Sequence, residues 1–205
     1  HGDSPDVLFG KAMPISNLRE IADQLPDYPL DRFPLEPLSG EGSTMPAHID
    51  SNGEVMQSWL ASGHAQAGVG CNACHVAVDD TSDEWVEQPD HSVCAQCHSG
   101  EVAGFLQGKH GMRLDVAALG RMMTPMSPAM ARLPMQTNAH RKELDCQSCH
   151  GAHSYELETA AVESCLGCHA DEHSLAYKDS AHYSLWQQEQ SGELPPGAGV
   201  SCASC

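Results

Sequence analysis

The ten cysteines of the chain are spaced for covalent attachment of a cofactor. All of them fall into five Cys-x-x-Cys pairs, and in four pairs a histidine follows the second cysteine directly. Cys-x-x-Cys-His is the motif that attaches haem in c-type cytochromes, where the thiols bond to the porphyrin and the histidine binds the iron. The pairs are Cys71 and Cys74, Cys94 and Cys97, Cys146 and Cys149, Cys165 and Cys168, and Cys202 and Cys205. We expect the histidines that complete the motif to be proximal iron ligands: His75, His98, His150 and His169.

The fifth pair, Cys202-Ala-Ser-Cys205, ends the sequence. Its lead-in, Gly197-Ala-Gly-Val-Ser201, resembles the Ala67-Gly-Val-Gly70 segment before Cys71. A proximal histidine would stand at the next position, so we expect a longer natural chain with five or more haem c groups. A terminal disulfide, or a histidine from another subunit, is the alternative.

Three other uses of cysteine fit the sequence less well than haem attachment. The pairs at 146–149 and 165–168 are spaced as in a four-cysteine zinc site, but zinc gives no reason for a histidine after each pair. Disulfide scaffolds do not repeat a single two-residue spacing. A thioredoxin-like dithiol needs a βαβ setting, which the sequence lacks.

Distal iron ligands are expected among the nine histidines outside the motifs. Three of these stand in a repeated pattern, aromatic-x-x-small-x-His, and a fourth follows Cys149-His150 by three positions. We predict these four as distal ligands: His64, His110, His153 and His182. His140, His173 and His91 form a second rank, while His1 and His48 are expected at the surface. Methionine is a competing ligand that would raise the reduction potential. The candidates are Met112, Met122, Met123, Met126, Met130 and Met135. The histidine surplus favours two histidines per iron.

The fold class expected is mainly α with long loops, organised around stacked haems, with little or no β structure. Thin aromatic content, 5%, suits a core completed by porphyrins. We expect helices at 17–25, 54–63, 100–109, 159–168, 171–178 and 181–191, and a short one starting at Ser127-Pro128. The predicted parts are a cysteine-free wrapping arm (1–53), a segment with two complete motifs (54–110), a Met- and Pro-rich connector (111–139), and a segment with two complete motifs and the fifth pair (140–205).

The formal charge of −18 argues against nucleic acid and anionic membranes as partners. No apolar run is long enough to cross a membrane. The first residue is His1, so we expect an exported protein whose leader has been removed, in the periplasm or outside the cell. The expected partners are redox proteins, other cytochromes or further copies of the chain.

Residues 140–205 resemble the haem-binding core of the hydroxylamine oxidoreductase-like multihaem cytochromes. The residues that carry the resemblance are the motifs at 146–150 and 165–169, Ala152-His153, Ala160, His173, Tyr177, Ser180, His182 and 201–205. Residues 59–110 are similar more loosely. That group includes ammonia-forming nitrite reductases and octahaem tetrathionate reductases. The resemblance implies closely stacked haems with two histidine ligands each, and it carries over no activity.

Two functions follow from these observations. The first is electron transfer, including by a protein that docks or polymerises to extend a chain of haems. The alternative is a multihaem oxidoreductase acting on hydroxylamine, nitrite or tetrathionate. The Cys-x-x-Cys-Lys site of the nitrite reductases is absent, and none of the four tyrosines occupies a recognisable equivalent of the cross-linked tyrosine of hydroxylamine oxidation. We therefore assign no catalytic residue and favour electron transfer.

Overall fold

The computed structural model describes residues 30, 35–40, 44–49, 53–76, 85–121, 123–139, 142–156, 158–195 and 197–204. The account below is confined to them. The predicted helix at 17–25, most of the predicted N-terminal arm, His1, Met122, His140 and Cys205 lie outside the described residues.

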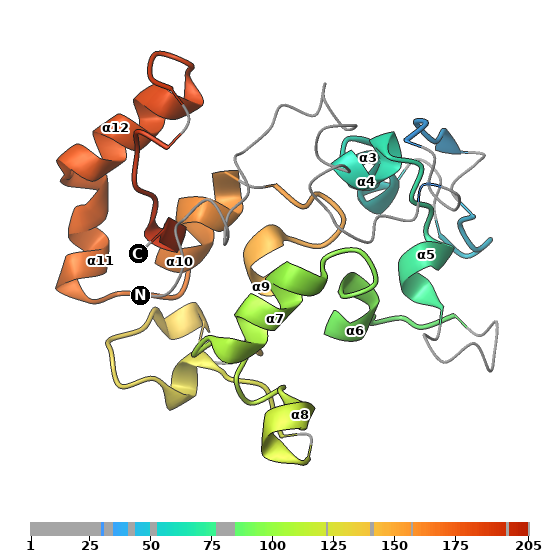
Figure 1. Cartoon of the computed structure of the whole chain (residues 1–205), viewed down its shortest axis with the longest axis horizontal. Helices are drawn as coiled ribbons and strands as arrows, with labels where there is room; N and C mark the ends of the chain where they lie inside the picture. Colours follow the sequence, from blue (N-terminus) through green and yellow to red (C-terminus); the bar gives the residue numbers. More distant parts are fainter. Residues whose placement is uncertain are drawn as a thin grey trace. The chain divides into compact units, whose positions relative to one another are not determined.

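Short helices make up almost all of the regular structure (Figure 1). The α-helices are α3 (Glu54–Leu60), α4 (Gly63–Gln66), α5 (Asn72–His75), α6 (His91–Cys94), α7 (Ser99–Gln107), α8 (Val116–Leu119), α9 (Gln147–His150), α10 (Ser164–Leu166), α11 (Glu172–Ala176) and α12 (Ala181–Gln190). Single turns of 3₁₀ helix lie at Pro128–Met130, Thr137–Ala139, Tyr177–Asp179 and Cys202–Ser204, and a π-helical turn lies at Thr159–Glu163. The described residues contain no strand, only the isolated bridges Val76–Trp85 and Met135–His169. The predicted fold class, mainly α with long loops, is confirmed.

The predicted helix at 54–63 is two helices. Ser62 has an extended backbone and its side chain accepts a hydrogen bond from Ala65 N–H, so it ends the first helix and caps the second. The π-helical turn before α10 and the 3₁₀ turn after α11 likewise divide the segments predicted as single helices at 159–168 and 171–178. The segment predicted at 181–191 is helical over Ala181–Gln190.

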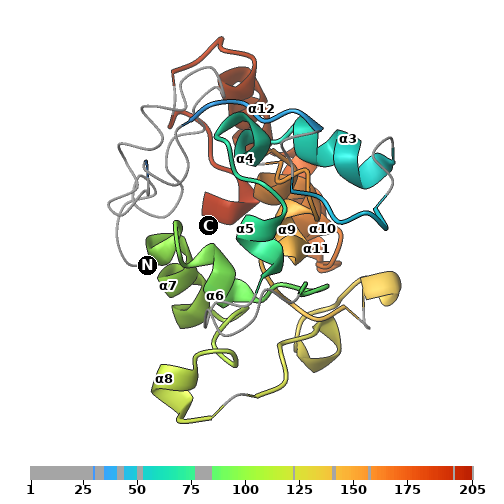
Figure 2. The ribbon, with the colours of Figure 1, turned by 90° about the vertical axis from the view of Figure 1, so that its right-hand side faces the viewer.

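The described chain forms two compact units, and the boundary falls within α7. The N-terminal unit contains the described residues up to Ala103 together with Ala152–Tyr155. Its α3 and α4 lie side by side in Figures 1 and 2. Met56, Trp59 and Ala65 form one buried cluster, and Ala67 and Val69 form another just before Cys71.

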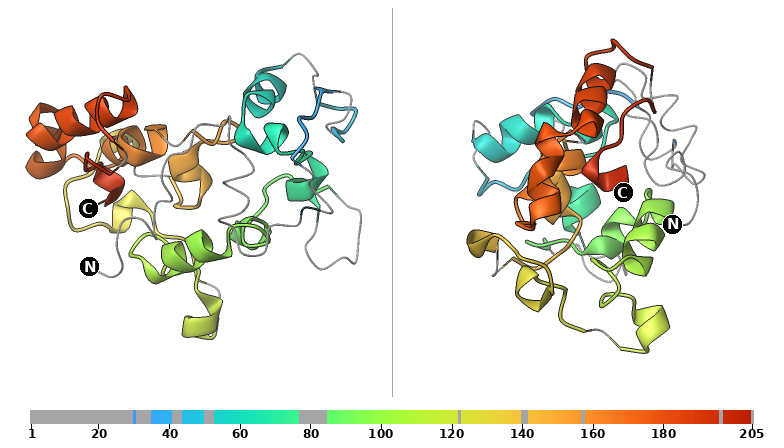
Figure 3. Two further views of the ribbon diagram at one scale, coloured as in Figure 1. Left: turned by 45° about the horizontal axis from the view of Figure 1, so that its top comes forward. Right: turned by 90° about the vertical axis from the view of Figure 1, so that its left-hand side faces the viewer.

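The C-terminal unit contains Gly104–Gly151 and the residues from Glu156 onward. Its centre is the Thr159–Glu163 turn, which contacts α9, α10 and the Cys202–Ser204 turn (Figure 3). Val162 in this turn is fully buried. The Ser164 hydroxyl donates to the Cys149 carbonyl at 2.5 Å, which joins the third and fourth cysteine motifs.

Few hydrophobic side chains are buried among the described residues: Met56, Trp59, Ala65, Ala67, Val69, Val102, Ala139 and Val162. Three of them are alanines, so the polypeptide supplies little apolar volume of its own. That interior suits a bulky apolar cofactor. No helix in the described ranges is long and apolar enough to cross a membrane.

Candidate haem-binding sites

Each complete cysteine motif forms one helical turn. In all four, the backbone N–H of the histidine donates to the carbonyl of the first cysteine. The N–O distances are 3.0 Å for His75 to Cys71, 2.8 Å for His98 to Cys94, 3.1 Å for His150 to Cys146 and 2.8 Å for His169 to Cys165. Positions i, i+3 and i+4 share one face of a helix, so both thiols and the imidazole of a motif lie on the same side. The nine described cysteines are all half-buried.

Three of the motif histidines have an oxygen beside ring atom Nδ1. His75 Nδ1 lies 2.7 Å from the Val86 carbonyl oxygen, an acceptor for Nδ1–H. His98 Nδ1 lies 3.9 Å from Glu101, and His169 Nδ1 lies 3.8 Å from Asp171. An acceptor within hydrogen-bond distance of Nδ1, as at His75, orients the ring and leaves Nε2 to bind a metal, as in the metal-ligating histidines of other proteins. The carboxylates beside His98 and His169 lie beyond that distance.

Three motif histidines each lie opposite one predicted distal histidine. The ring centroids are 6.1 Å apart for His75 and His153, 6.0 Å for His98 and His64, and 6.2 Å for His169 and His110. The angles between ring planes are 12°, 90° and 64° in the same order. The separation is thus nearly constant, whereas the mutual orientation varies.

The pKa values of two distal candidates are lowered by their surroundings. It lowers the pKa of His110, with a further lowering from His169, and it lowers the pKa of His153, with a further lowering from His75. A lowered pKa favours the neutral imidazole, which is the form that binds metals.

The other predicted distal ligands are placed differently. His182 and His173 lie on α12 and α11 and are exposed, as His110 also is, and His91 begins α6. None of the three forms a ring pair with a motif histidine within the described ranges. Among the candidate methionines, Met112 and Met130 are exposed and Met123, Met126 and Met135 are half-buried.

Two aromatic residues beside these histidines were not identified from the sequence. Trp85 stacks on His75, with ring centroids 4.3 Å apart and planes 3° apart. Its Nε1–H is buried with no hydrogen-bond partner among the described residues, so a cofactor carboxylate would be a suitable acceptor there. Tyr155 packs edge-on against His64 at 4.6 Å and 83°. Sequence spacing gives no signal for either contact, because both bring together residues that are not helical neighbours.

The backbone from 151 to 155 is unusual. Gly151, His153 and Tyr155 all have positive φ, at 71°, 67° and 52°. Non-glycine residues seldom adopt this conformation, and it persists where the surroundings impose it. Here it directs His153 to His75 and Tyr155 to His64, all within the N-terminal unit.

Thiols from three cysteine pairs gather in the C-terminal unit. Burial, with smaller contributions from the nearby Cys202, Cys149 and Cys168, raises the pKa of Cys165 to about 12. Burial also raises the pKa of Cys149, followed by Cys168 and Asp145. No group of three or more Cys, His, Asp or Glu in the described part of the chain is arranged to hold a metal ion directly, as a four-cysteine zinc site would require.

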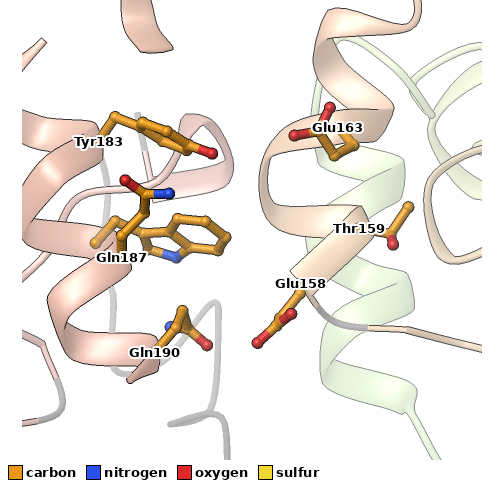
Figure 4. A pocket seen from close by; sticks show the side chains of 7 residues that line it. Glu158, Thr159, Glu163, Tyr183, Gln187 and Gln190 are labelled. Carbon is orange, nitrogen blue, oxygen red and sulfur yellow. The ribbon is translucent and has the colours of Figure 1, made fainter. Parts of the chain in front are cut away.

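A cleft of about 360 Å³ separates α12 from the Thr159–Glu163 turn (Figure 4). Its residues are Glu158, Thr159, Glu163, Tyr183, Trp186, Gln187 and Gln190. Tyr183 and Gln187 lie on one wall of the cleft, while Glu163 on the other forms an ion pair with Lys178 at 2.7 Å. No cysteine or histidine of the described residues lines it.

Residues 115–205 match the Class III cytochrome C family. The matched region contains the pairs at 146–149, 165–168 and 202–205. No curated protein and no solved structure matches the chain. The family match supports a multihaem c-type cytochrome that carries covalently bound haems and works with redox partners. The residues present fit that cofactor, because each complete motif supplies two thiols and an imidazole on one helical turn.

Proposed function

We propose that the chain is an electron-transfer protein whose haem irons are each bound by two histidines. The observation that supports this most directly is the matched separation of the three histidine pairs, 6.0–6.2 Å. Imidazoles bind metals such as zinc at about 2.0–2.1 Å, and each ring centre lies about 1 Å beyond its nitrogen, so two imidazoles on opposite sides of one ion are separated by about 6 Å. Each pair combines one motif histidine with one predicted distal histidine.

The four complete motifs would hold haem through two thioethers each, with His75, His98, His150 and His169 as proximal ligands. When bound, haem supplies a one-electron iron couple, and two histidine ligands leave no open position for a substrate. The protein's own part is to orient the rings. The carbonyl of Val86 fixes His75, and the carboxylates of Glu101 and Asp171 lie beside His98 and His169.

The finer assignments belong to the same proposal. The haem arrangement is that of the hydroxylamine oxidoreductase-like cytochromes, the protein works in the periplasm or outside the cell, and its partners are redox proteins or further copies of the chain. An oxidoreductase acting on a small nitrogen or sulfur compound would need an iron with an open position. The three histidine pairs favour the carrier over that alternative.

The test compares single variants of the purified holoprotein. His64→Ala, His110→Ala and His153→Ala should each convert one low-spin haem to a high-spin or water-bound haem in the oxidised optical spectrum. His48→Ala is the control, because the His48 side chain is 57% exposed and lies beside Glu87, at 3.8 Å, and the edge of Trp85, with ring centroids 6.1 Å apart, and not beside a motif histidine. Unchanged spectra in all three variants, or steady turnover of nitrite or hydroxylamine by the unaltered protein, would overturn the proposal.

A further inference from the structure

Two segments far apart in the sequence share one pattern of local hydrogen bonds. In the first, the Ser62 hydroxyl donates to the Trp59 carbonyl at 2.6 Å and accepts from Ala65 N–H at 3.3 Å. In the second, the Ser180 hydroxyl donates to the Tyr177 carbonyl at 2.6 Å and accepts from Tyr183 N–H at 3.3 Å. In each case the serine follows the aromatic residue by three positions and caps the next helix.

The polar atom of the aromatic side chain is also used in the same way. Trp59 Nε1–H donates to the Val69 carbonyl at 3.2 Å, and the Tyr177 hydroxyl donates to the Val200 carbonyl at 2.8 Å. Each valine stands two positions before the first cysteine of a pair, Cys71 or Cys202. An indole and a phenol are different donors, so what recurs is the hydrogen bond itself. We call this bond, from the aromatic side chain to the valine carbonyl before a cysteine pair, the tether.

A histidine occupies the same place in both segments. His64 and His182 each follow the capping serine by two positions, in the first turn of α4 and of α12. His64 lies opposite His98 at 6.0 Å, whereas His182 is exposed in the described chain. In the first segment, the histidine at this position is therefore placed to share an iron with a motif histidine.

The two segments differ in length between the histidine and the valine. Val69 follows His64 by five positions and Val200 follows His182 by 18, because α12 continues well beyond its first turn. The longer connection is folded back by Glu189, whose carboxylate accepts from Gly197 N–H at 2.8 Å and Gly199 N–H at 2.7 Å. Gly199 lies so close to α12 that an added Cβ would collide with the backbone of Trp186. Despite the extra residues, the Val200 carbonyl therefore stays within hydrogen-bond distance of the Tyr177 hydroxyl.

The third sequence copy, Phe105 to His110, lacks these features. Gly108 replaces the capping serine, and phenylalanine carries no polar atom to form the tether. The hydrogen-bond pattern therefore separates residues 59–74 and 177–205 from this third segment, although all three fit the same sequence pattern.

We propose that residues 59–74 and 177–205 are two copies of one haem-holding module. Cys202 and Cys205 attach a haem, as Cys71 and Cys74 do, and His182 is a distal ligand of a haem, as His64 is. Trp59 and Tyr177 are positioning residues that fix the entry to the cysteine pair relative to the distal histidine. The inference rests on the proposed function and extends it to the fifth cysteine pair and to His182.

Peptide mapping of the holoprotein, in the form that its gene encodes, tests the attachment. A peptide containing Cys202 and Cys205 should carry the mass of one haem, and Cys202→Ser with Cys205→Ser should lower the total by one haem. A bare 202–205 peptide beside four loaded motifs would overturn the module and leave the proposed function standing. Bare peptides at all five pairs would overturn both.

Variants of Tyr177 test the tether with a control taken from the other copy. Tyr177→Phe removes only the hydroxyl and should shift the reduction potential of one haem, whereas Tyr177→Trp supplies the indole donor of Trp59 and should restore it. His182→Ala should create one high-spin haem, and His48→Ala should not. Equal potentials in the Phe variant and the unaltered protein, or no spectral change in His182→Ala, would contradict the assignment.

Discussion

The edge-on contact between Tyr155 and His64 has a consequence for the iron that His64 is proposed to bind. Tyr155 holds the His64 ring at 83° to its own, and His64 stands at 90° to His98. The angle between axial imidazoles determines how the iron d orbitals split, and outer contacts set that angle. Tyr155→Leu should therefore alter one low-spin signal in the electron paramagnetic resonance spectrum, while Tyr155→Phe should preserve it. An unchanged signal in the leucine variant would show that other contacts orient His64.

Trp85 has a comparable part at His75. The indole stacks on the imidazole at 4.3 Å, and the bridge between Val76 and Trp85 closes the backbone beside it. Loss of an outer contact typically weakens metal binding about 10–100-fold. We expect Trp85→Leu to increase the fraction of one haem that becomes high-spin on mild heating, measured optically. Trp85→Phe should behave nearly like tryptophan, since it keeps the stacking surface; equal losses in both variants would point to the buried Nε1–H instead.

The residues proposed to bear the chemistry could be nominated from the sequence, but their neighbours could not. The cysteine motifs are local, and the helical turn that each forms follows from its own spacing. His64, His110 and His153 were chosen by pattern, and the structure places each opposite a motif histidine. Trp85 and Tyr155 act through contacts that depend on a bridge and on positive φ values, and no sequence period encodes those.

Capping side chains define the elements of this molecule more than helix length does. Ser62, Asp90, Asp115, Asp171 and Ser180 each accept a hydrogen bond from a backbone N–H of the helix that follows. Helices of four to ten residues are unstable in isolation, so the caps and the surrounding structure must stabilise them. This is also why the sequence predicted one helix at 54–63 where two exist: the apolar spacing continues through Ser62, but its side chain competes with the helical backbone.

Asp90 offers a test of such a cap beside the second motif. It accepts from Ser92 N–H at 2.7 Å at the start of α6, which ends at Cys94. Asp90→Ala should lower the free energy of unfolding by about 1 kcal/mol, measured by denaturant titration of the holoprotein. Asp90→Asn, which keeps an oxygen acceptor, is the matched control and should lose less.

The stability difference between the unaltered protein and Asp90→Ala should depend on pH in a definite direction. The side-chain hydrogen bond from Ser92 holds the pKa of Asp90 below its ordinary value. A carboxylate with a lowered pKa contributes stability above its ordinary pKa of about 3.9, and the contribution is lost as the pH falls below that. The gap between the unaltered protein and Asp90→Ala should therefore narrow in acid. A gap that widened in acid would exclude the charged carboxylate as its source.

At the scale of the whole molecule, charge is distributed unevenly along the chain. Residues 109–142 contain six of the ten Lys and Arg but only one of the 28 acidic residues, a net charge of +5, while the remaining residues carry −23. Lys109, Arg121, Arg132 and Lys142 are exposed, and Lys109 directly precedes His110. An anionic reagent should therefore approach the His110–His169 pair more readily than the overall charge of −18 suggests.

Oxidation of the reduced protein by hexacyanoferrate(III) measures this effect. Lys109→Glu combined with Arg121→Glu should slow the reaction several-fold at low ionic strength, and the difference should fade at high salt as screening increases. Lys178→Gln is the control, because Lys178 lies outside the basic segment and pairs with Glu163. Equal rates for all three proteins at low salt would show that electrons leave elsewhere.

Ala152–Tyr155 follow the connector in the sequence but belong to the N-terminal unit, and this limits how related genes can recombine. The two halves of the sequence each carry a run of cysteine motifs, and a gene joined from separate halves at the connector would preserve every motif. In such a hybrid, however, His75 and His64 would come from one parent, and their partners His153 and Tyr155 would come from the other. A chimera of two related sequences should therefore lose function at these sites unless residues 151–155 come from the same parent as the N-terminal half. The ancestry of this protein is thus better traced through that five-residue segment than through its cysteines.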